Sequence, residues 1–595
     1  MISLSAYGDP SAAKYAAVWV KRIGNGWVAV HNTNSIGFQN FYNTYTANTK
    51  NFVPVIISVT GTTTANAIFA AVFELNAASS LLLYYGMNSA QFASNNANAL
   101  SQNLYLVSLT IYGTPSARLY AAIWHGNSVY TKWHVHAADS AAAFAVTFAQ
   151  ETQLPGVTPN AYRPALIAIS SDQTYASVFK DNYVGPWTAY YGLSAAALQA
   201  QLNQQSAAGY YPISLQGGGI GSGTVFAVIF AAQDIPSPRV FTATGPVAAF
   251  VNVAPFDNLM KSFMVANGVR AAQLAIAVNG VNSLSRAYTW AESAYRQTQP
   301  SDTFLLASLS KIFLEAAVQS LYDSNRIHTY SLVYPLLGFS NPADTRSNSI
   351  TIQQLLDHQG GYDDSSSGSG FDPTYNMRYI AQRLQLGRPA NKLDIATYMY
   401  KNYVLDFTPG TNTAYSNYGY LLASAVVEKV TGMDYFAYVK QATLTPLGIT
   451  EVAVSSTLAS GRPVTQAITE DQGLAYNALY VTTDVISPSV YGGDGEIKEV
   501  GAGCAGIAAS AQAMVQFIHV NKVWGNGPRS AYSGNFELER TGSTPGSSTM
   551  AASRSGGIDW AFNINTRDWP ANVPQNANLG YLGAEIDNLI TSANL

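Results

Sequence analysis

Charged residues are scarce in this sequence, and it contains a single cysteine. Asp, Glu, Lys and Arg make up 11% of the 595 residues, and the formal net charge is −4. So small a net charge gives no electrostatic basis for binding nucleic acid or an anionic membrane, and we expect neither partner. Cys504 has no second cysteine with which to form a disulfide. Its glycine and alanine neighbours indicate a buried filler rather than a reactive thiol.

Long apolar runs, glycosylation sites and a leader pattern are missing as well. No apolar stretch reaches the length needed to span a bilayer. No Asn-x-Ser/Thr motif occurs, despite many Asn, Ser and Thr residues. Residues 1–15 lack a basic segment followed by an apolar one, so no signal peptide is expected in this sequence. The few charges and abundant small polar residues favour an extracellular protein, and we expect a secreted one.

A short aromatic segment recurs in the N-terminal part of the chain. A chain of this length is too long for one core, so two or more domains are expected. The recurring segments are Tyr15–Trp19, Phe69–Phe73, Tyr120–Trp124, Tyr175–Phe179 and Phe226–Phe230. Their first residues are 51 to 55 positions apart. A regular period of this length indicates a tandem-repeat architecture.

The sequence pattern of each repeat predicts two or three strands and one short helix. The helices are expected to begin at the capping residues Ser35, Asn88, Asp139 and Ser194. Such a unit cannot bury its apolar face alone, so neighbouring units must cover it. Four full units and a partial fifth predict a mainly β, propeller-like or toroidal array over residues 1–246. The pattern resembles a tandem-repeat family found mainly in bacterial proteins and also fused to fungal secreted hydrolases.

His134 and His136 are the one feature of the repeats that could indicate a metal site. They lie on the same face of a predicted strand. No third ligand of suitable spacing stands out, so we expect ordinary strand histidines and neither a metal nor a cofactor. The aromatic residues are expected to form core between repeats rather than a carbohydrate platform. The repeats would position substrate or anchor the protein to a cell wall.

Residues 247–595 contain a candidate nucleophile, Ser308, followed three residues later by Lys311. At this spacing on a helix the two side chains lie on one face. A serine needs an adjacent base to become a nucleophile, and a lysine can act as one where apolar burial lowers its pKa. The pattern alone also fits an ordinary capping serine with a solvated lysine, so its interpretation depends on the motifs that follow.

The predicted elements of this second domain form a sheet from both ends of its sequence. A helix is expected over 257–267. Two strands, 272–278 and 285–290, are joined at an Asn279-Gly280 turn signal. Three late strands are expected over 536–540, 548–553 and 559–565. The result is an antiparallel sheet with a helical insert, which is an α+β domain.

Several motifs follow the nucleophile in a characteristic order. Phe304–Lys311 resembles the nucleophile motif of penicillin-recognising serine hydrolases, the family of class C β-lactamases, DD-peptidases, D-aminopeptidases and related esterases. The segment Ile350–His358 is similar to the next helix of that family, and Tyr415-Ser-Asn417 to its Tyr-x-Asn motif. Its third motif is usually Lys-Thr-Gly or His-x-Gly. This chain has Arg540-Thr541-Gly542-Ser543 there.

The resemblance implies a class C β-lactamase-like fold and a role for each motif residue. Ser308 would form an acyl-enzyme, and Asn417 would hydrogen-bond to the substrate or to Lys311. Lys311 and Tyr415 would handle the proton, with Tyr415 activating Ser308 and protonating the leaving group as a phenolate stabilised by cations such as Lys311. The backbone N–H groups of Ser308 and Ser543 would bind the oxyanion.

Arg540 departs from the family pattern. Arginine keeps the positive charge but cannot exchange protons near neutral pH, so no proton-shuttle role is expected. A contact with the substrate through the Arg540–Ser543 segment remains open, and so does a surface ion pair with Glu537 or Glu539. His358 is expected to be structural, because this catalytic group needs no imidazole.

The combination of both domains resembles the fungal polyglycine hydrolases, secreted proteases that cut Gly-Gly bonds in the linker of plant defence chitinases. The resemblance implies a serine endopeptidase acting on glycine-rich peptide, with a plant chitinase as a candidate substrate. We expect the protein to be a monomer. Two alternatives stay open. One is an esterase, D-aminopeptidase, DD-peptidase or β-lactamase-type hydrolase acting on a small substrate. The other is a non-catalytic binding protein, which the joint presence of Ser308, Lys311 and Tyr415 disfavours.

Overall fold

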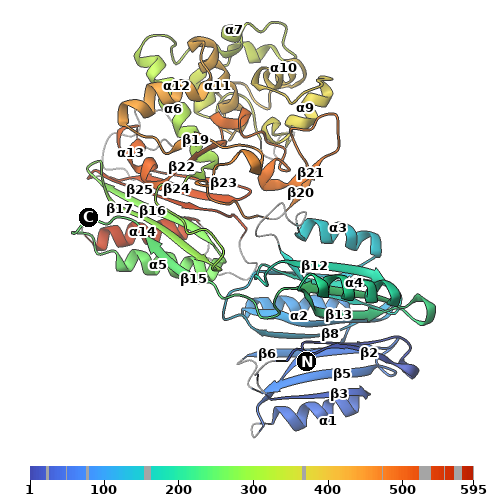
Figure 1. Cartoon of the computed structure of the whole chain (residues 1–595). Helices are drawn as coiled ribbons and strands as arrows, with labels where there is room; N and C mark the ends of the chain where they lie inside the picture. The colour runs from blue at the N-terminus through green and yellow to red at the C-terminus, as the bar shows by residue number, and fades with distance from the viewer. Residues whose placement is uncertain are drawn as a thin grey trace. The chain divides into compact units, whose positions relative to one another are not determined.

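The computed structural model divides into two compact units, with the division between Pro238 and Arg239 (Figure 1). It describes residues 1–21, 24, 26–47, 50–75, 80–152, 162–364, 370–471, 473–521, 538–554, 556–568, 579–593 and 595. The division lies N-terminal to the predicted boundary at 246/247. The reason is strand β15 (Val240–Thr244), which pairs with β17 (Val281–Ala291) of the second unit.

The first unit consists of small antiparallel sheets that follow the predicted repeats. One sheet has two strands, β1 (Ser3–Tyr7) and β2 (Lys14–Val18). Four sheets have three strands: β3 (Trp27–Thr33), β5 (Ile68–Leu75) and β4 (Phe52–Thr60); β6 (Leu81–Met87), β8 (Ala117–Gly126) and β7 (Leu104–Thr114); β9 (Trp133–Asp139), β11 (Tyr175–Lys180) and β10 (Arg163–Ile169); β12 (Trp187–Leu193), β14 (Val225–Ala231) and β13 (Tyr211–Gly218).

The strand order within these sheets differs from the unit expected from the sequence. In each of the four three-stranded sheets the aromatic segment is the central strand, whereas the first segment, Tyr15–Trp19, begins in β2 of the two-stranded sheet. The strand that begins at Trp27 pairs with β5 of the following repeat, not with β2 of its own. Each sequence repeat is therefore joined to the next by shared backbone hydrogen bonds as well as by packing.

Four helices cover these sheets: α1 (Ser35–Thr46), α2 (Ser89–Ser101), α3 (Ala141–Thr152) and α4 (Ala195–Ala207). Asn88 and Ser194 cap α2 and α4 as predicted, whereas Asn34 and Ser140 cap α1 and α3. In three of these helices, α1, α2 and α3, one aromatic ring stacks on the first residue of an aromatic segment in a central strand. The pairs are Phe38 with Phe69, Phe92 with Tyr120 and Phe144 with Tyr175, with ring centroids 5.1, 4.9 and 4.8 Å apart. The repeated aromatic residues thus form core in the four three-stranded sheets, whereas Trp19 of the first segment is exposed.

The first strands of the repeats contact one another in the order β1, β4, β7, β10, β13, and β13 also contacts β1. Serine hydroxyls bridge the strand pairs. Ser58 Oγ accepts from Ala6 N at 2.8 Å, and Ser108 Oγ accepts from Ile57 N at 3.0 Å. Ser3 Oγ accepts from Leu215 N at 2.9 Å, which links the first and last repeats across 212 positions of sequence.

The second unit is built on a six-stranded antiparallel sheet in the order β15-β17-β16-β25-β24-β23. Its other strands are β16 (Ala271–Val278), β23 (Leu538–Thr544), β24 (Ser547–Ser553) and β25 (Ile558–Ile564). Asn279 and Gly280 turn between β16 and β17 with φ angles of 52° and 77°, as the turn signal predicts. The first two residues of the predicted strand 536–540 lie outside the described residues.

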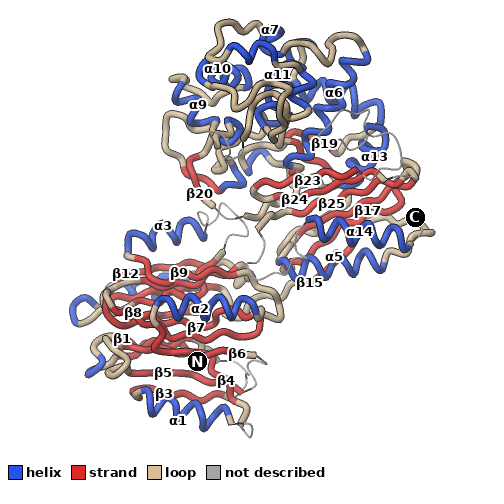
Figure 2. The backbone as a smooth tube through the Cα atoms, turned by 180° about the vertical axis from the view of Figure 1, so that it is seen from behind, coloured by secondary structure: helices blue, strands red, loops and turns tan. Residues whose placement is uncertain are grey.

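Helices cover both faces of this sheet. Helices α5 (Ala254–Asn267) and α14 (Leu579–Ser592) pack together on one face, and α13 (Ala511–Asn521) lies on the other. Figure 2 shows this layering from behind. The C-terminal helix α14 was not predicted, although its buried Leu582, Ile586 and Ile590 follow a helical spacing.

A helical region fills the middle of the second unit. Its helices are α6 (Lys311–Asp323), α7 (Val333–Leu337), α8 (Ile352–Leu356), α9 (Met377–Arg383), α10 (Lys392–Asn402), α11 (Asn417–Thr431) and α12 (Tyr435–Val439). Its short strands are β18 (Phe304–Leu305), β19 (Val452–Val454), β20 (Leu474–Tyr476), β21 (Ile486–Pro488) and β22 (Ile507–Ala509). None of the helices in the described ranges is long and apolar enough to cross a membrane.

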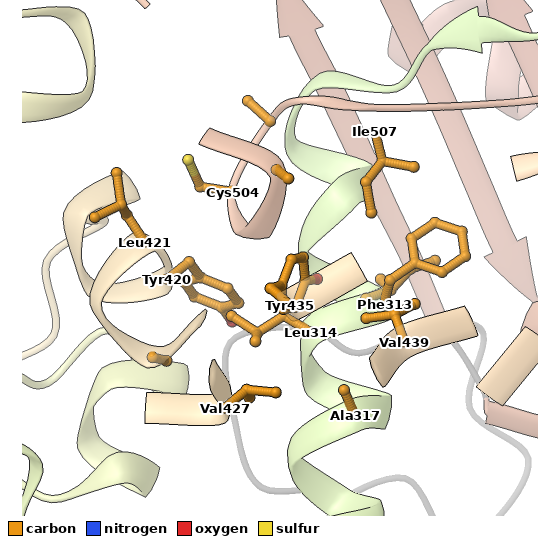
Figure 3. Packing of buried hydrophobic residues seen from close by; sticks show 14 of the residues in the cluster. Phe313, Leu314, Ala317, Tyr420, Leu421, Val427, Tyr435, Val439, Cys504 and Ile507 are labelled. Carbon is orange, nitrogen blue, oxygen red and sulfur yellow. The ribbon is translucent and has the colours of Figure 1, made fainter. Parts of the chain in front are cut away.

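Helix α6 is the centre of this region and is buried along most of its length. Figure 3 shows Phe313, Leu314 and Ala317 of α6 packed among side chains of α11, α12 and the segment around Cys504. Cys504 is fully buried, as expected of a filler, and burial raises the pKa of its thiol well above the usual range. This packing fixes the position of α6 and of the turn that precedes it.

Candidate active site

Ser308 lies in a tight turn between a strand and the buried helix α6. Strand β18 pairs with β22, and a 3-10 turn, Ala307–Ser310, then leads into α6. Leu306 anchors the turn, because its N–H donates to Ile507 O at 2.8 Å and its carbonyl accepts from Thr549 Oγ1 at 2.9 Å. Ala307, the residue before Ser308, has a φ of 50°. A non-glycine residue is held in this unfavourable region only where its surroundings fix the backbone.

The structure brings both Lys311 and Tyr415 within hydrogen-bonding distance of Ser308. Ser308 Oγ lies 2.6 Å from Tyr415 Oη and 3.3 Å from Lys311 Nζ. Tyr415 reaches the serine from a loop 107 positions further along the chain. Its side chain is 42% exposed, so this part of the site is open to solvent.

Lys311 has the surroundings of a charged ammonium group. Besides Ser308 Oγ, its Nζ lies 2.7 Å from Asn417 Oδ1 and 3.0 Å from Cys504 O. Three oxygen acceptors match the three N–H bonds of an ammonium group. Nζ also lies 4.9 Å from the centroid of the Tyr415 ring. This geometry favours Lys311 as a fixed positive charge, and it leaves the Tyr415 oxygen to exchange a proton with Ser308.

Two aspartates that the sequence analysis did not identify hold the Tyr-x-Asn segment. Asn417 Nδ2 donates to Asp372 Oδ2 at 2.8 Å, which turns the amide oxygen of Asn417 toward Lys311. Asp364 accepts from the backbone N–H of Asn417 and from Ser416 Oγ. Burial, followed by the nearby charge of Asp372, raises the pKa of Asp364 to about 8. Nothing in their spacing links these aspartates to Asn417, because the chain must fold before they meet.

His358 supports Tyr415 from behind. Its Nδ1 accepts from the backbone N–H of Ser416 at 3.1 Å, and its ring centroid lies 4.7 Å from that of Tyr415. Burial, and then the positive charges of Lys311 and Arg540, lower the pKa of His358 to about 3. The imidazole is therefore neutral near pH 7. Its contacts with the Ser416 backbone and the Tyr415 ring fix the position of Tyr415, which agrees with the structural role expected for His358.

Arg540 forms a buried ion pair, not the surface pair considered above. Its Nη1 lies 2.6 Å from Glu315 Oε1, and the two side chains are only 9% and 1% exposed. Glu539, its exposed neighbour, is not its partner in this pair, and Glu537 lies outside the described residues. Burial alone would lower the pKa of Arg540, but Glu315 and Tyr420 outweigh it and raise this pKa. Glu315 was missed, although a carboxylate one turn after Lys311 on an apolar helix is a visible signal.

Strand β23 runs directly against the nucleophile turn because residue 542 is glycine. A Cβ atom there would lie 2.2 Å from Leu306 O and 3.0 Å from Leu309 N. Thr541 and Ser543, on either side, are exposed. The backbone of Ser543 is thereby placed next to the turn that carries Ser308, as a pair of oxyanion-binding N–H groups would require.

In the first unit, His134 and His136 contact a carboxylate that the sequence analysis did not identify. Glu151, at the end of α3, lies 2.9 Å from His134 Nδ1 and 2.8 Å from His136 Nε2. Burial raises the pKa of Glu151, but hydrogen bonds from both histidines outweigh it and lower this pKa to about 2. Within the described parts of the chain, no group of three or more His, Cys, Asp or Glu residues is arranged to hold a metal ion.

Two family models match the chain. The model described as Beta-lactamase matches residues 256–579, more than half of the sequence. The model described as "Polyglycine hydrolase-like, structural repeat" matches residues 1–22, 24–76, 82–127 and 184–233. The second match leaves out 128–183, but β9, α3, β10 and β11 repeat the sheet-and-helix arrangement there.

Curated relatives match only part of the chain. The "Putative D-alanyl-D-alanine carboxypeptidase" of Escherichia coli O157:H7 is 31% identical over 173 residues, which is 28% of this chain and 37% of the relative. "Protein flp" of Staphylococcus aureus is 23% identical over 203 residues, or 34% of this chain and 38% of the relative. The alignments thus span little more than a third of each relative.

Solved structures match a larger share of the chain than the curated relatives do. A D-stereospecific amidohydrolase from Streptomyces sp. is 20% identical and covers 56% of this chain and 99% of its own, with a TM-score of 0.39. A class C β-lactamase is 14% identical and covers 57% of this chain and 97% of its own, also with a TM-score of 0.39. On the match to residues 256–579, the chain belongs to the beta-lactamase family, with polyglycine hydrolase-like structural repeats ahead of that domain.

Proposed function

We propose that this member of the family is a serine peptidase that acts through an acyl-enzyme on Ser308. The observation that carries the proposal is the contact of Ser308 Oγ with Tyr415 Oη at 2.6 Å, beside the positive charge of Lys311. A serine with both a proton acceptor and a fixed cation within reach has what nucleophilic catalysis needs.

The reaction follows from these contacts. Tyr415, as a phenolate stabilised by Lys311, takes the proton of Ser308 while the serine oxygen attacks the substrate carbonyl. The backbone N–H groups of Ser308 and Ser543 bind the resulting oxyanion, and each such donor is worth roughly 3 kcal/mol. Tyr415 then gives the proton to the leaving amine, and an acyl-enzyme remains. Tyr415 then takes a proton from a water molecule as that water attacks the ester carbonyl, and it gives this proton to the Ser308 oxygen as the ester bond breaks and the acid is released.

For the substrate, we propose glycine-rich peptide, with the linker of a plant chitinase as one candidate. Support comes from the repeats, which match a polyglycine hydrolase-like model, and from relatives that are named as D-alanyl-D-alanine carboxypeptidases. The exposed Tyr415 leaves room for a polymer. We also propose that the protein is secreted and acts as a monomer.

We further propose that the five sheets of the first unit close into a ring. The support is the contact of β1 with both β4 and β13, together with the hydrogen bonds of Ser3 with Leu215 and of Ser5 with Gly217. A closed array leaves no terminal repeat with an uncovered apolar face. Such a ring would be a rigid body suited to holding a polymeric substrate.

A panel of substrates tests the proposed activity. Wild type and Ser308→Ala are incubated with a polyglycine-linker peptide, p-nitrophenyl esters and nitrocefin, with Ser324→Ala as a control at an exposed serine on the end of α6. The proposal predicts cleavage of the peptide by wild type and the control only. Turnover of the esters or nitrocefin without the peptide would instead identify a hydrolase for small substrates.

A further inference from the structure

Strand β23 brings one cation, Arg540, to the active site. This cation is held in an ion pair with Glu315. Arg540 begins the motif Arg540–Ser543, whose later residues lie along the nucleophile turn. Its Nη1 contacts Glu315 Oε1 at 2.6 Å, and only 9% of its side chain is exposed. The guanidinium is therefore turned toward the protein interior and away from solvent.

Side chains from two helices hold the guanidinium there. Glu315 lies on α6, four residues after Lys311, and so faces the same side of the helix. Tyr420 on α11 places its hydroxyl 2.5 Å from the same Glu315 oxygen, and its ring centroid lies 5.6 Å from the guanidinium carbon of Arg540. A buried pair with a second hydrogen-bonding partner is costly to break, because each charge would be left uncompensated.

The remaining charged groups give the site no surplus of positive charge. Lys311 is hydrogen-bonded to Asn417 Oδ1 and Cys504 O, and the carboxylate of Asp372 accepts from Nδ2 of the same Asn417, so a negative charge lies near this cation. His358 is neutral near pH 7. An anionic group bound beside Ser308 would therefore lose its hydration without gaining a dedicated cation.

We propose that Glu315 determines the substrate class of this site by holding Arg540. With Arg540 paired, the site does not bind the free terminal carboxylate of a peptide, and it selects peptides whose chain continues, or is capped as an amide, beyond the cleaved bond. Glu315 thus acts on specificity through Arg540, as a positioning residue. This inference rests on the proposed peptidase function and adds the class of peptide to it.

The test compares two substrates that differ by one charge. Both are acetylated glycine peptides cleaved at the last peptide bond; one ends in a free carboxylate and the other in a carboxamide. For wild type, we expect kcat/KM to be higher for the carboxamide by about tenfold or more. Equal rates, or faster cleavage of the carboxylate, would overturn the inference while leaving the peptidase function intact. Cleavage of neither peptide would count against the peptidase function itself.

A matched pair of variants locates the effect. Glu315→Gln keeps the side-chain shape and an oxygen for Tyr420 but removes the charge that holds Arg540. The ratio of kcat/KM for carboxylate over carboxamide should then rise several-fold. Glu539→Gln removes the same charge from an exposed neighbour on β23 and should keep the wild-type ratio. Equal ratios in both variants would contradict the role of Glu315. If Glu315→Gln fails to fold, the wild-type comparison still decides.

Discussion

At the scale of single residues, the surroundings of Lys311 and Tyr415 divide the chemistry between them. Lys311 donates to three oxygens, one of which is that of Ser308. Tyr415 makes the shorter contact with Ser308 and is open to solvent. In the proposed mechanism, the lysine therefore supplies charge and the tyrosine moves the proton.

Tyr415→Phe tests this division. The variant loses the oxygen that takes the proton from Ser308, and kcat should fall by about 10²- to 10⁴-fold. Thermal stability should hardly change, because the side chain is 42% exposed. Tyr330→Phe, at a tyrosine that is 70% exposed, is the matched control and should behave as wild type. A kcat for Tyr415→Phe close to that of wild type would mean that another group takes the proton from Ser308.

The carboxylate of Glu151 predicts a pH dependence of stability in the first unit. Its pKa is lowered from 4.5 to about 2 in the folded state. A carboxylate whose pKa is lower in the folded state than in the unfolded state stabilises the fold at pH values above its unfolded pKa. This stabilisation is lost as the pH falls toward the folded pKa. We expect Glu151→Gln to destabilise this unit near pH 7 by up to about 3 kcal/mol and to match wild type near pH 2. Denaturant unfolding at pH 7, 4 and 2 measures this, and a constant difference across that range would contradict it.

At the scale of elements, a single glycine brings the edge strand of the large sheet against the nucleophile. A methyl group at residue 542 would overlap Leu306 O. Because the clash is with backbone, it can be relieved only by moving β23 or the turn that carries Ser308.

Gly542→Ala should therefore reduce activity far more than stability. Overpacking of this kind costs typically 1 to 3 kcal/mol of folding free energy. The displaced oxyanion donor should lower kcat by about 10²-fold or more. Gly387→Ala, at a glycine with open space around it, is the control. Full activity in Gly542→Ala would show that β23 does not border the reacting atoms.

Elements with a local signal could be predicted from the sequence, whereas long-range pairings could not. The aromatic strands, the Asn279-Gly280 turn and the order of the motifs around Ser308 and Tyr415 were all visible. The pairing of β3 with β5 was not, because it depends on contacts between repeats. For the same reason Arg540 could not be assigned to Glu315, which lies 225 positions away.

At the scale of the whole molecule, the chain combines two compact units with different architectures. Small antiparallel sheets form the first, while the sheet of the second joins β16 to β25 across most of its sequence. In the first unit, hydrogen bonds of Ser3 and Ser5 join the first and last repeats.

The proposed ring predicts that these two serines support the whole first unit. Each buried hydrogen bond contributes about 1 kcal/mol. The double variant Ser3→Ala, Ser5→Ala should lower the stability of the first unit by about 2 kcal/mol or more, since its buried partners on β13 lose their acceptors. Ser11→Ala, at an exposed serine of the same repeat, serves as the control. An unchanged unfolding transition in the double variant would argue against closure through β1 and β13.

The most direct measurement of the central claim is the mass of the acyl-enzyme. Wild type is mixed with a slowly hydrolysed p-nitrophenyl ester, quenched in acid within the first turnovers, digested and analysed by mass spectrometry. We predict one acyl group on Ser308, formed far more slowly in Tyr415→Phe and absent from Ser308→Ala. An acyl group on another residue, or full turnover by Ser308→Ala, would contradict the account.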